Sequence, residues 1–102
     1  MKIFLDDLRE CPNGWIQARN YNEMIKLLEE NKAKVEEISL DHDLGETKTG
    51  YDICKYLVEN DFWFMSKITI HTANAVGAKN MYELLDRYAP KNIKLYHRFA
   101  NI

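Results

Sequence analysis

Three short apolar segments of this chain each end in side chains that can bind a metal or move a proton. Two carboxylates about 4 Å apart repel each other by about 4 kcal/mol at an effective dielectric of 20, so a cluster of them requires protons or a cation. A site rich in carboxylate oxygens suits Mg²⁺, Mn²⁺ or Ca²⁺. The residues concerned are Asp6, Asp7, Asp41, His42, Asp43 and His71.

Two histidines adjoin these carboxylates. His42 lies between Asp41 and Asp43, and His71 directly follows an apolar segment. Histidine titrates near neutral pH, so both are candidates to move protons during cleavage of a P–O bond. The alternative for each is a hydrogen-bonded structural residue, which is our interpretation of His97. Imidazole ligands would also soften the site and admit Mn²⁺ or Zn²⁺.

Short apolar or alternating segments predict five strands. The turn sequence Cys11-Pro12-Asn13-Gly14 separates the first two strands and leaves too few residues for a helix between them. The expected strands cover residues 2–5, 15–19, 37–40, 68–70 and 93–99.

Three helices are predicted between the later strands. Asn20 and Thr49 are N-cap candidates, and each has an acidic residue three positions later, Glu23 and Asp52, as in a capping box. The third helix carries an apolar stripe and ends before Pro90. Strands that alternate with single helices indicate parallel βαβ units, so we expect one α/β domain over residues 1–102 with a small, open, parallel five-stranded sheet.

In such a sheet, ligands bind beyond the carboxyl ends of the strands, which is where the carboxylates and His71 fall. Helix N-termini at Thr49-Gly50 and Asn74-Ala75 would offer backbone N–H groups to an anion. Arg9 and Arg98 could pair with a phosphate group. The alternative is that the aspartates cap helices and the arginines are solvated.

Several of these motifs resemble response-regulator receiver domains. Phe4-Leu5-Asp6-Asp7 is similar to the acidic pair after the first receiver strand, Ile38-Ser39-Leu40-Asp41 to the third strand with its phospho-accepting aspartate, and Thr72-Ala73 to the end of the fourth strand. The resemblance implies a flavodoxin-like topology in which Asp6 and Asp7 bind Mg²⁺. It also implies that Asp41 is the central carboxylate and that Thr72 contacts a phosphoryl oxygen.

The departures from receivers are informative. Receivers carry a Lys-Pro pair after the fifth strand, whereas this chain has Tyr96-His97-Arg98-Phe99. The helix between the first two receiver strands and the helix after the last are predicted to be lost or reduced. Phosphorelay signalling is therefore not the favoured reading.

A longer pattern is similar to a receiver-like group described as cyclic-phosphate-processing receiver domains. It comprises Ile38 to Gly45, then Thr49-Gly50-Tyr51-Asp52, then Ile70 to Asn74. The resemblance implies a site that binds or opens a cyclic phosphate on a nucleotide-like molecule.

Composition sets the remaining limits. The 102 residues carry a net charge of −2, which argues against general coating of nucleic acid. Apolar runs are too short to cross a membrane, and Cys11 and Cys54 show no disulfide or zinc spacing, so we expect a cytoplasmic location.

The favoured hypothesis is divalent-metal-dependent hydrolysis of a cyclic phosphate, with Mg²⁺ or Mn²⁺ held by Asp6, Asp7, Asp41 and Asp43. Proton transfer by Asp41, His42 or His71 and phosphate contacts from Thr72, Asn74, Arg9 and Arg98 complete the expected site. The alternatives are a phospho-accepting signalling receiver and a non-catalytic module that binds a nucleotide or a protein. Whether Asp41 or Asp43 is the central carboxylate stays open.

Overall fold

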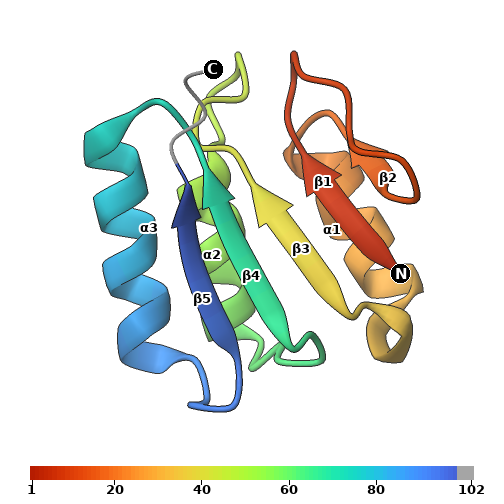
Figure 1. Cartoon of the computed structure of the whole chain (residues 1–102), viewed down its shortest axis with the longest axis vertical. Coiled ribbons are helices and arrows are strands. Elements are labelled where there is room, and N and C mark those ends of the chain that lie inside the picture. Colours follow the sequence, from red (N-terminus) through yellow and green to blue (C-terminus); the bar gives the residue numbers. More distant parts are fainter. Residues whose placement is uncertain (99–102) are drawn as a thin grey trace.

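A computed structural model of the chain describes residues 1–98 and contains one five-stranded sheet. All neighbouring strands are parallel, in the order β2-β1-β3-β4-β5 (Figure 1). This confirms the expected parallel α/β fold; of the last predicted strand, Phe99 lies outside the described residues. The strands are β1 (Lys2–Leu5), β2 (Ile16–Ala18), β3 (Glu37–Leu40), β4 (Lys67–His71) and β5 (Lys94–Arg98).

Three helices follow strands β2, β3 and β4, and their starts are set by local side chains. They are α1 (Tyr21–Glu30), α2 (Gly50–Glu59) and α3 (Ala75–Tyr88), and a short 3-10 helix, Lys32–Lys34, follows α1. Asn20 caps α1 by accepting a hydrogen bond from the Glu23 amide. Thr49 and Asp52 form the capping box predicted for α2.

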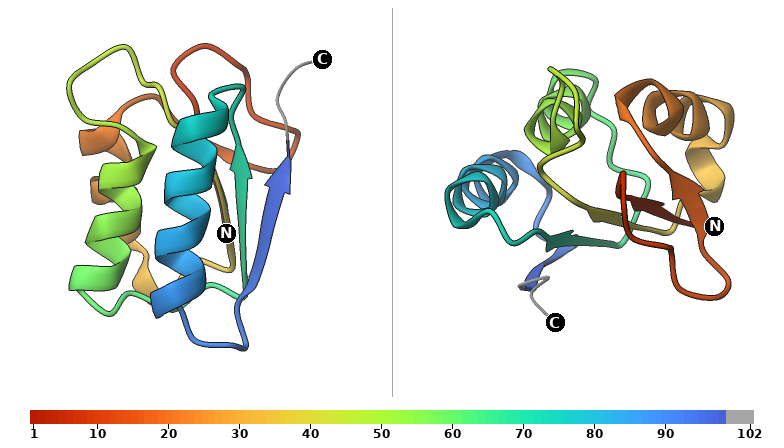
Figure 2. Two further views of the ribbon diagram at one scale, coloured as in Figure 1. Left: turned by 90° about the vertical axis from the view of Figure 1, so that its left-hand side faces the viewer. Right: turned by 90° about the horizontal axis from the view of Figure 1, so that it is seen from above.

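All three helices lie against the same face of the sheet (Figure 2). Their apolar sides meet alternate residues of the central strands to form a single core. The core residues from these strands are fully or almost fully buried: Ile3, Leu5, Ile38, Leu40, Ile68 and Ile70. We call this the covered face of the sheet.

No helix of the described residues packs on the opposite face, which we call the uncovered face. β1 passes to β2 through a loop without a helix, as the sequence predicts, and this loop projects away from the helices (Figure 2, right). The Cys11 amide donates to Gln17 Oε1 at 2.7 Å, and the Cys11 thiol lies 3.4 Å from the Trp15 carbonyl oxygen. These contacts hold the loop to the edge of the sheet.

Strand register aligns polar and aromatic residues of the uncovered face in rows across the sheet. Phe4 pairs with Ser39, Ser39 with Thr69, and Thr69 with Tyr96. Because side chains alternate along a strand, the residue two positions after each member points to the same face. The sheet therefore positions its chemically active side chains one row beyond Ser39, at the carboxyl edge.

No helix of the described residues is long and apolar enough to cross a membrane.

Candidate metal and phosphate site

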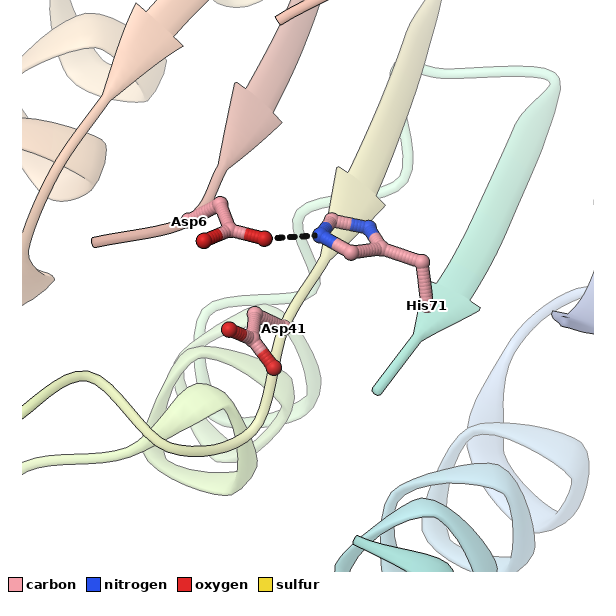
Figure 3. Close-up of side chains that lie close together, drawn as sticks. All are labelled: Asp6, Asp41 and His71. Atoms are coloured by element: carbon pink, nitrogen blue, oxygen red, sulfur yellow. Dashed lines mark hydrogen bonds and ion pairs between the residues drawn. The ribbon is translucent and has the colours of Figure 1, made fainter. Parts of the chain in front are cut away.

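Asp6, Asp41 and His71 converge at the carboxyl edge of three adjacent strands. Each offers one ligand atom, and these atoms lie within 4.8 Å of one another (Figure 3). Asp6 follows β1, Asp41 follows β3 and His71 ends β4. The parallel register, and not proximity in sequence, thus brings together two carboxylates and an imidazole.

The Asp6 carboxylate is buried and accepts hydrogen bonds at both oxygens. Its Oδ1 accepts the amides of Leu8 and Arg9 at 2.9 and 2.8 Å. Its Oδ2 lies 3.0 Å from His71 Nε2, and the residue is only 2% exposed. The first bonds turn the chain sharply after β1, and the last one joins this turn to β4.

The His71 ring is enclosed on several sides. Its Nδ1 lies 2.7 Å from Ser39 Oγ, and the ring stacks on Phe4 with centroids 4.3 Å apart and an interplanar angle of 5°. Burial lowers the His71 pKa below its usual value, and the nearby Asp6 carboxylate opposes that shift. Weaker repulsion from Arg9 and Arg98 acts in the same direction as burial. These effects favour a neutral imidazole near pH 7.

Asp41 has a carboxylate whose pKa is raised by its surroundings. Burial, and then repulsion by Asp6, raise its pKa to about 6. Hydrogen bonds from the His42 amide and the Thr72 side chain partly offset this increase. The Asp6 and Asp41 carboxylates repel each other when both are ionised. A bound cation would remove this repulsion, so the pair suits a cation site.

Close packing at Gly50 fixes the backbone behind Asp41. A Cβ atom at this position would lie 1.9 Å from the Asp41 carbonyl oxygen, so that only glycine fits. The amides of Gly50 and Tyr51 donate to the His42 carbonyl oxygen and to Thr49 Oγ1. The first turn of α2 therefore does not offer these amides to an anion, contrary to the expectation from Thr49-Gly50.

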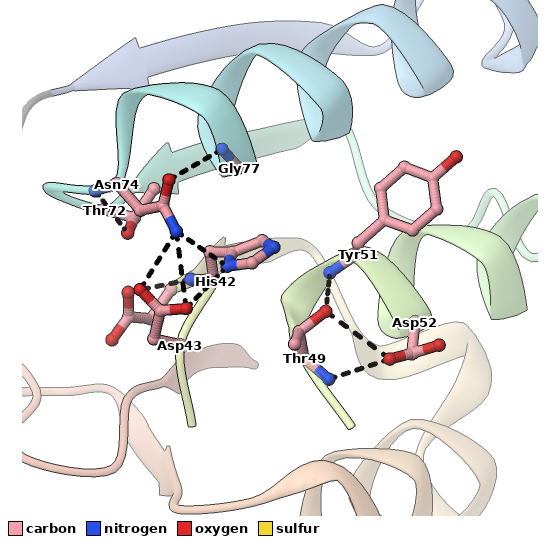
Figure 4. A network of polar contacts seen from close by, with 9 residues as sticks. His42, Asp43, Thr49, Tyr51, Asp52, Thr72, Asn74 and Gly77 are labelled. Atoms are coloured by element: carbon pink, nitrogen blue, oxygen red, sulfur yellow. Dashed lines mark hydrogen bonds and ion pairs between the residues drawn. The ribbon is translucent and has the colours of Figure 1, made fainter. Parts of the chain in front are cut away.

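His42, Asp43 and Asn74 form a second polar group beside the first (Figure 4). His42 Nδ1 lies 2.9 Å from Asp43 Oδ1, and Asn74 Nδ2 donates to Asp43 Oδ2 at 3.2 Å. The bond from His42 is the main cause of a lowered Asp43 pKa. The Asn74 side chain also accepts the Gly77 amide and so caps α3. Asn74 thus serves the start of α3 as well as the rim of the site.

His42 faces away from the paired carboxylates. A Cβ atom on Gly77 would lie 2.5 Å from the imidazole, because α3 packs directly on the ring. His42 lines a groove of about 740 Å³ between α2 and α3 that has a single carboxylate, Glu83. The volume of this groove exceeds that of the site, but the clustered acids and His71 lie elsewhere.

The converging residues line a cavity of about 380 Å³, within the usual range for small-molecule sites. Arg9 lines this cavity, whereas Arg98 lines a smaller hollow on the uncovered face. Asp7 also lines the cavity of about 380 Å³, near Gly45. The full lining is Asp6, Asp7, Leu8, Arg9, Asp41, Asp43, Gly45, His71, Thr72, Ala73 and Asn74.

Ser39 and Phe4 contact His71 but were not among the predicted site residues. Both are ordinary strand residues by type, so nothing in their chemistry marks them. Their position could have done so, because Ser39 precedes Asp41 by two residues and Phe4 precedes Asp6 by two, which places each on the same face as the acid.

Comparison with known proteins supplies one match. The family model described as cyclic-phosphate processing receiver domain matches residues 1–87. No curated protein and no solved structure matches the chain. The match spans strands β1 to β4 and every residue of the carboxylate cavity. The chain therefore belongs to the family of cyclic-phosphate processing receiver domains.

Proposed function

We propose that this domain binds Mg²⁺ or Mn²⁺ and hydrolyses a cyclic phosphate ester on a nucleotide-like molecule. The observation that carries the proposal is the meeting of Asp6, Asp41 and His71 within 4.8 Å in a cavity of ligand size. Membership of the cyclic-phosphate family supplies the class of ligand. Neither the metal nor the reaction follows from the family alone.

The donor set fits a hard divalent cation. Asp6 and Asp41 present carboxylate oxygens side by side, and the Asp41 pKa of about 6 reflects a cost that a cation would remove. Asp7 lines the same cavity and is the natural third ligand. Oxygen ligands favour Mg²⁺ or Mn²⁺. When bound, such an ion supplies polarisation of the phosphoryl oxygens and activation of a water molecule.

The remaining side chains have distinct roles. Arg9 and Thr72 line the cavity and would bind phosphoryl oxygens. His71 Nε2 lies 3.0 Å from Asp6 Oδ2 and would donate a hydrogen bond to this carboxylate, which orients it toward the metal. His42 is tied to Asp43 and packed under α3, so it would position Asp43 and not exchange protons with the ligand.

Hydrolysis has a simple balance. A water oxygen bonds to phosphorus, and one ester P–O bond of the ring breaks. One proton leaves the water and one joins the freed alkoxide oxygen to make a hydroxyl group, so the product is an open phosphate monoester. Carboxylates and an imidazole line the same cavity, and groups of these kinds can carry out such proton transfers.

The test is ³¹P NMR of the protein with Mg²⁺ or Mn²⁺ and a panel of cyclic phosphates that includes 2′,3′-cyclic nucleotides and cyclic dinucleotides. We expect one cyclic resonance to be replaced by that of a monoester, and chelation of the metal to stop the reaction. Asp41→Asn should lower the rate at least about 100-fold, by analogy with the loss of other charged catalytic groups. Asp43→Asn is the matched control and should retain more activity. Full activity of Asp41→Asn would refute the proposal.

A phospho-accepting receiver is the second candidate, because the Thr72 side chain hydrogen bonds to Asp41 and so lies where it could contact a phosphoryl group added to that residue. Acetyl phosphate should then add a phosphoryl group to Asp41, detectable by mass spectrometry. Binding of a cyclic phosphate without product would instead support a non-catalytic module.

A further inference from the structure

His71 is held between a carboxylate and a hydroxyl group that come from two other strands. Its Nε2 lies 3.0 Å from Asp6 Oδ2, and its Nδ1 lies 2.7 Å from Ser39 Oγ. Asp6, His71 and Ser39 are 2%, 7% and 6% exposed. Both ring nitrogens are therefore occupied by buried protein groups, and bulk water has little access to replace either partner.

For a neutral His71 ring, the chemistry of the two partners determines which nitrogen carries the proton. An ionised carboxylate can only accept, so Asp6 requires a proton on His71 Nε2. A neutral imidazole with its proton on Nε2 has a lone pair on Nδ1, which must accept a hydrogen bond. Ser39 is the group within reach, and its hydroxyl donates. The two contacts are thus compatible with one tautomer and one orientation of the ring.

The rest of the ring environment supports a single orientation. Phe4 stacks on the imidazole at an interplanar angle of 5°, which restricts tilting. Rotation of the ring by 180° would point carbon atoms at Asp6 and Ser39 and break both hydrogen bonds. Stacking on Phe4 alone cannot prevent this rotation, because the rotated ring would lie in the same plane. The two hydrogen bonds are what select one orientation.

Ser39 does not reach the cavity itself. It lines the hollow on the uncovered face, whereas the cavity of about 380 Å³ is lined by His71, Asp6 and Asp41 without Ser39. Any influence of Ser39 on a ligand must therefore pass through His71.

We propose that Ser39 is a positioning residue: its hydroxyl donates to His71 Nδ1 and, together with Asp6, holds the imidazole in one orientation at the edge of the cavity, with Nε2–H directed at Asp6 Oδ2. The consequence for catalysis rests on the proposed function, but the arrangement itself does not. In this state His71 is a hydrogen-bond donor beside the metal ligands and not a metal ligand.

Long-range ¹H–¹⁵N NMR of the ¹⁵N-labelled protein without metal tests the arrangement directly. The His71→Gln spectrum identifies the His71 signals. We expect the wild type to carry its proton on Nε2, and Ser39→Ala to shift the Nδ1 signal towards that of an unbonded nitrogen. Ser39→Thr keeps the hydroxyl on a strand-compatible side chain and should restore the signal. A proton on Nδ1 in the wild type, or an unchanged Nδ1 signal in Ser39→Ala, overturns the proposal.

Thr69→Val is the matched control. Thr69 pairs with Ser39 in the sheet, faces the same side and is similarly buried at 7%, but makes no hydrogen bond to His71 among the described contacts. Loss of its hydroxyl should leave the His71 signals in place. Addition of Mg²⁺ should also leave the proton on Nε2, and its transfer to Nδ1 would show that His71 is a ligand.

Activity gives an independent comparison. If a cyclic phosphate is hydrolysed, Ser39→Ala should lower kcat about 10-fold or more with KM within about twofold, as for other groups that orient a catalytic side chain. Ser39→Thr should recover most of the rate. An intact Nε2–H signal with no hydrolysis of any cyclic phosphate would reject the function but retain the positioning of His71.

Discussion

The two faces of the sheet differ in what holds them together. On the covered face, aliphatic side chains from the central strands are buried under three helices. On the uncovered face, polar and aromatic side chains pack against one another, and the candidate site is the last row of this network. The hydrophobic core thus lies on one face of the sheet, and the candidate site lies at the edge of the other.

Two lysines, Lys2 and Lys67, lie on the uncovered face, where no helix of the described residues packs. Glu37 lies 4.0 Å from Lys2 and 3.5 Å from Lys67. The same lysines lie over aromatic rings, Lys2 over Trp15 and Lys67 over Tyr96, at 5.7 and 4.9 Å from the ring centroids. Their aliphatic stems can shield the sheet while their charges stay near water. This shielding is adaptable, whereas the covered face depends on close packing.

The largest effect on stability should come from the covered face. Ile38→Ala removes a fully buried side chain at the centre of the core and should lower the free energy of unfolding by about 2–5 kcal/mol. Urea denaturation measures the change. Ile16→Ala, the same truncation at a position that is 38% exposed, should cost clearly less. Equal losses for the two variants would contradict the assignment of the core.

Gly50→Ala should have the next largest effect. The new Cβ would overlap the Asp41 carbonyl oxygen, and backbone atoms at a helix start cannot move away freely. We expect a loss of about 1–3 kcal/mol, as for other overpacked sites, together with displacement of Asp41. Thermal unfolding and Mg²⁺ titration of the variant measure the two consequences. An unchanged melting temperature would show that the β3–α2 junction is looser than the structure indicates.

Asp41→Asn should have the opposite sign. The folded-state pKa of Asp41 is raised from 3.8 to about 6. The stability that the protonated side chain contributes is therefore complete below pH 3.8 and is lost as the pH rises through 6. Allowing for solvent screening, the ionised side chain costs about 1–2 kcal/mol at pH 7. The metal-free variant should therefore be more stable than the wild type at pH 7.

Denaturation at several pH values checks this sign. The advantage of Asp41→Asn should shrink as the pH falls from 7 towards 4, and Mg²⁺ should reduce it at pH 7 by stabilising only the wild type. An Asn variant that is less stable than the metal-free wild type at pH 7 would mean that the ionised Asp41 side chain does not destabilise the fold as its raised pKa indicates.

The smallest effect should come from the uncovered face. Lys67→Met removes a half-buried ion pair, but Glu37 keeps Lys2 as a partner and an unbranched side chain stays over Tyr96, so stability should change by less than about 0.5 kcal/mol. Denaturant unfolding in low and high salt measures the change. A loss comparable to that of Ile38→Ala would mean that the two faces are equally critical for folding.

The sequence predicts the fold well because each element carries a local signal. The alternation of strand and helix, the Thr49–Asp52 capping box and the loop in place of a first crossover helix are all confirmed. What local patterns alone do not predict, and only the receiver resemblance implies, is that all the described helices lie on one face. That arrangement depends on strand order, which no local pattern encodes.

The site is less predictable from sequence, and for a geometric reason. The strand-end rule identifies Asp6, Asp41 and His71 as candidates, and the structure places them together. The rule cannot separate them from His42, which differs by one position from Asp41 and consequently points elsewhere. Ser39 has no distinctive chemistry of its own, and its contact with His71 emerges only from the register of β3 and β4.

The candidate site rests on β1, β3 and β4, the three inner strands of the sheet, and not on its edges. Fraying of β2 or β5 can therefore expose amides to exchange while the ligand groups stay assembled. Separating the inner strands, in contrast, unfolds the whole domain. A cation bound here should consequently slow hydrogen exchange throughout the inner strands by the same factor, because ligand release and global unfolding become one linked equilibrium.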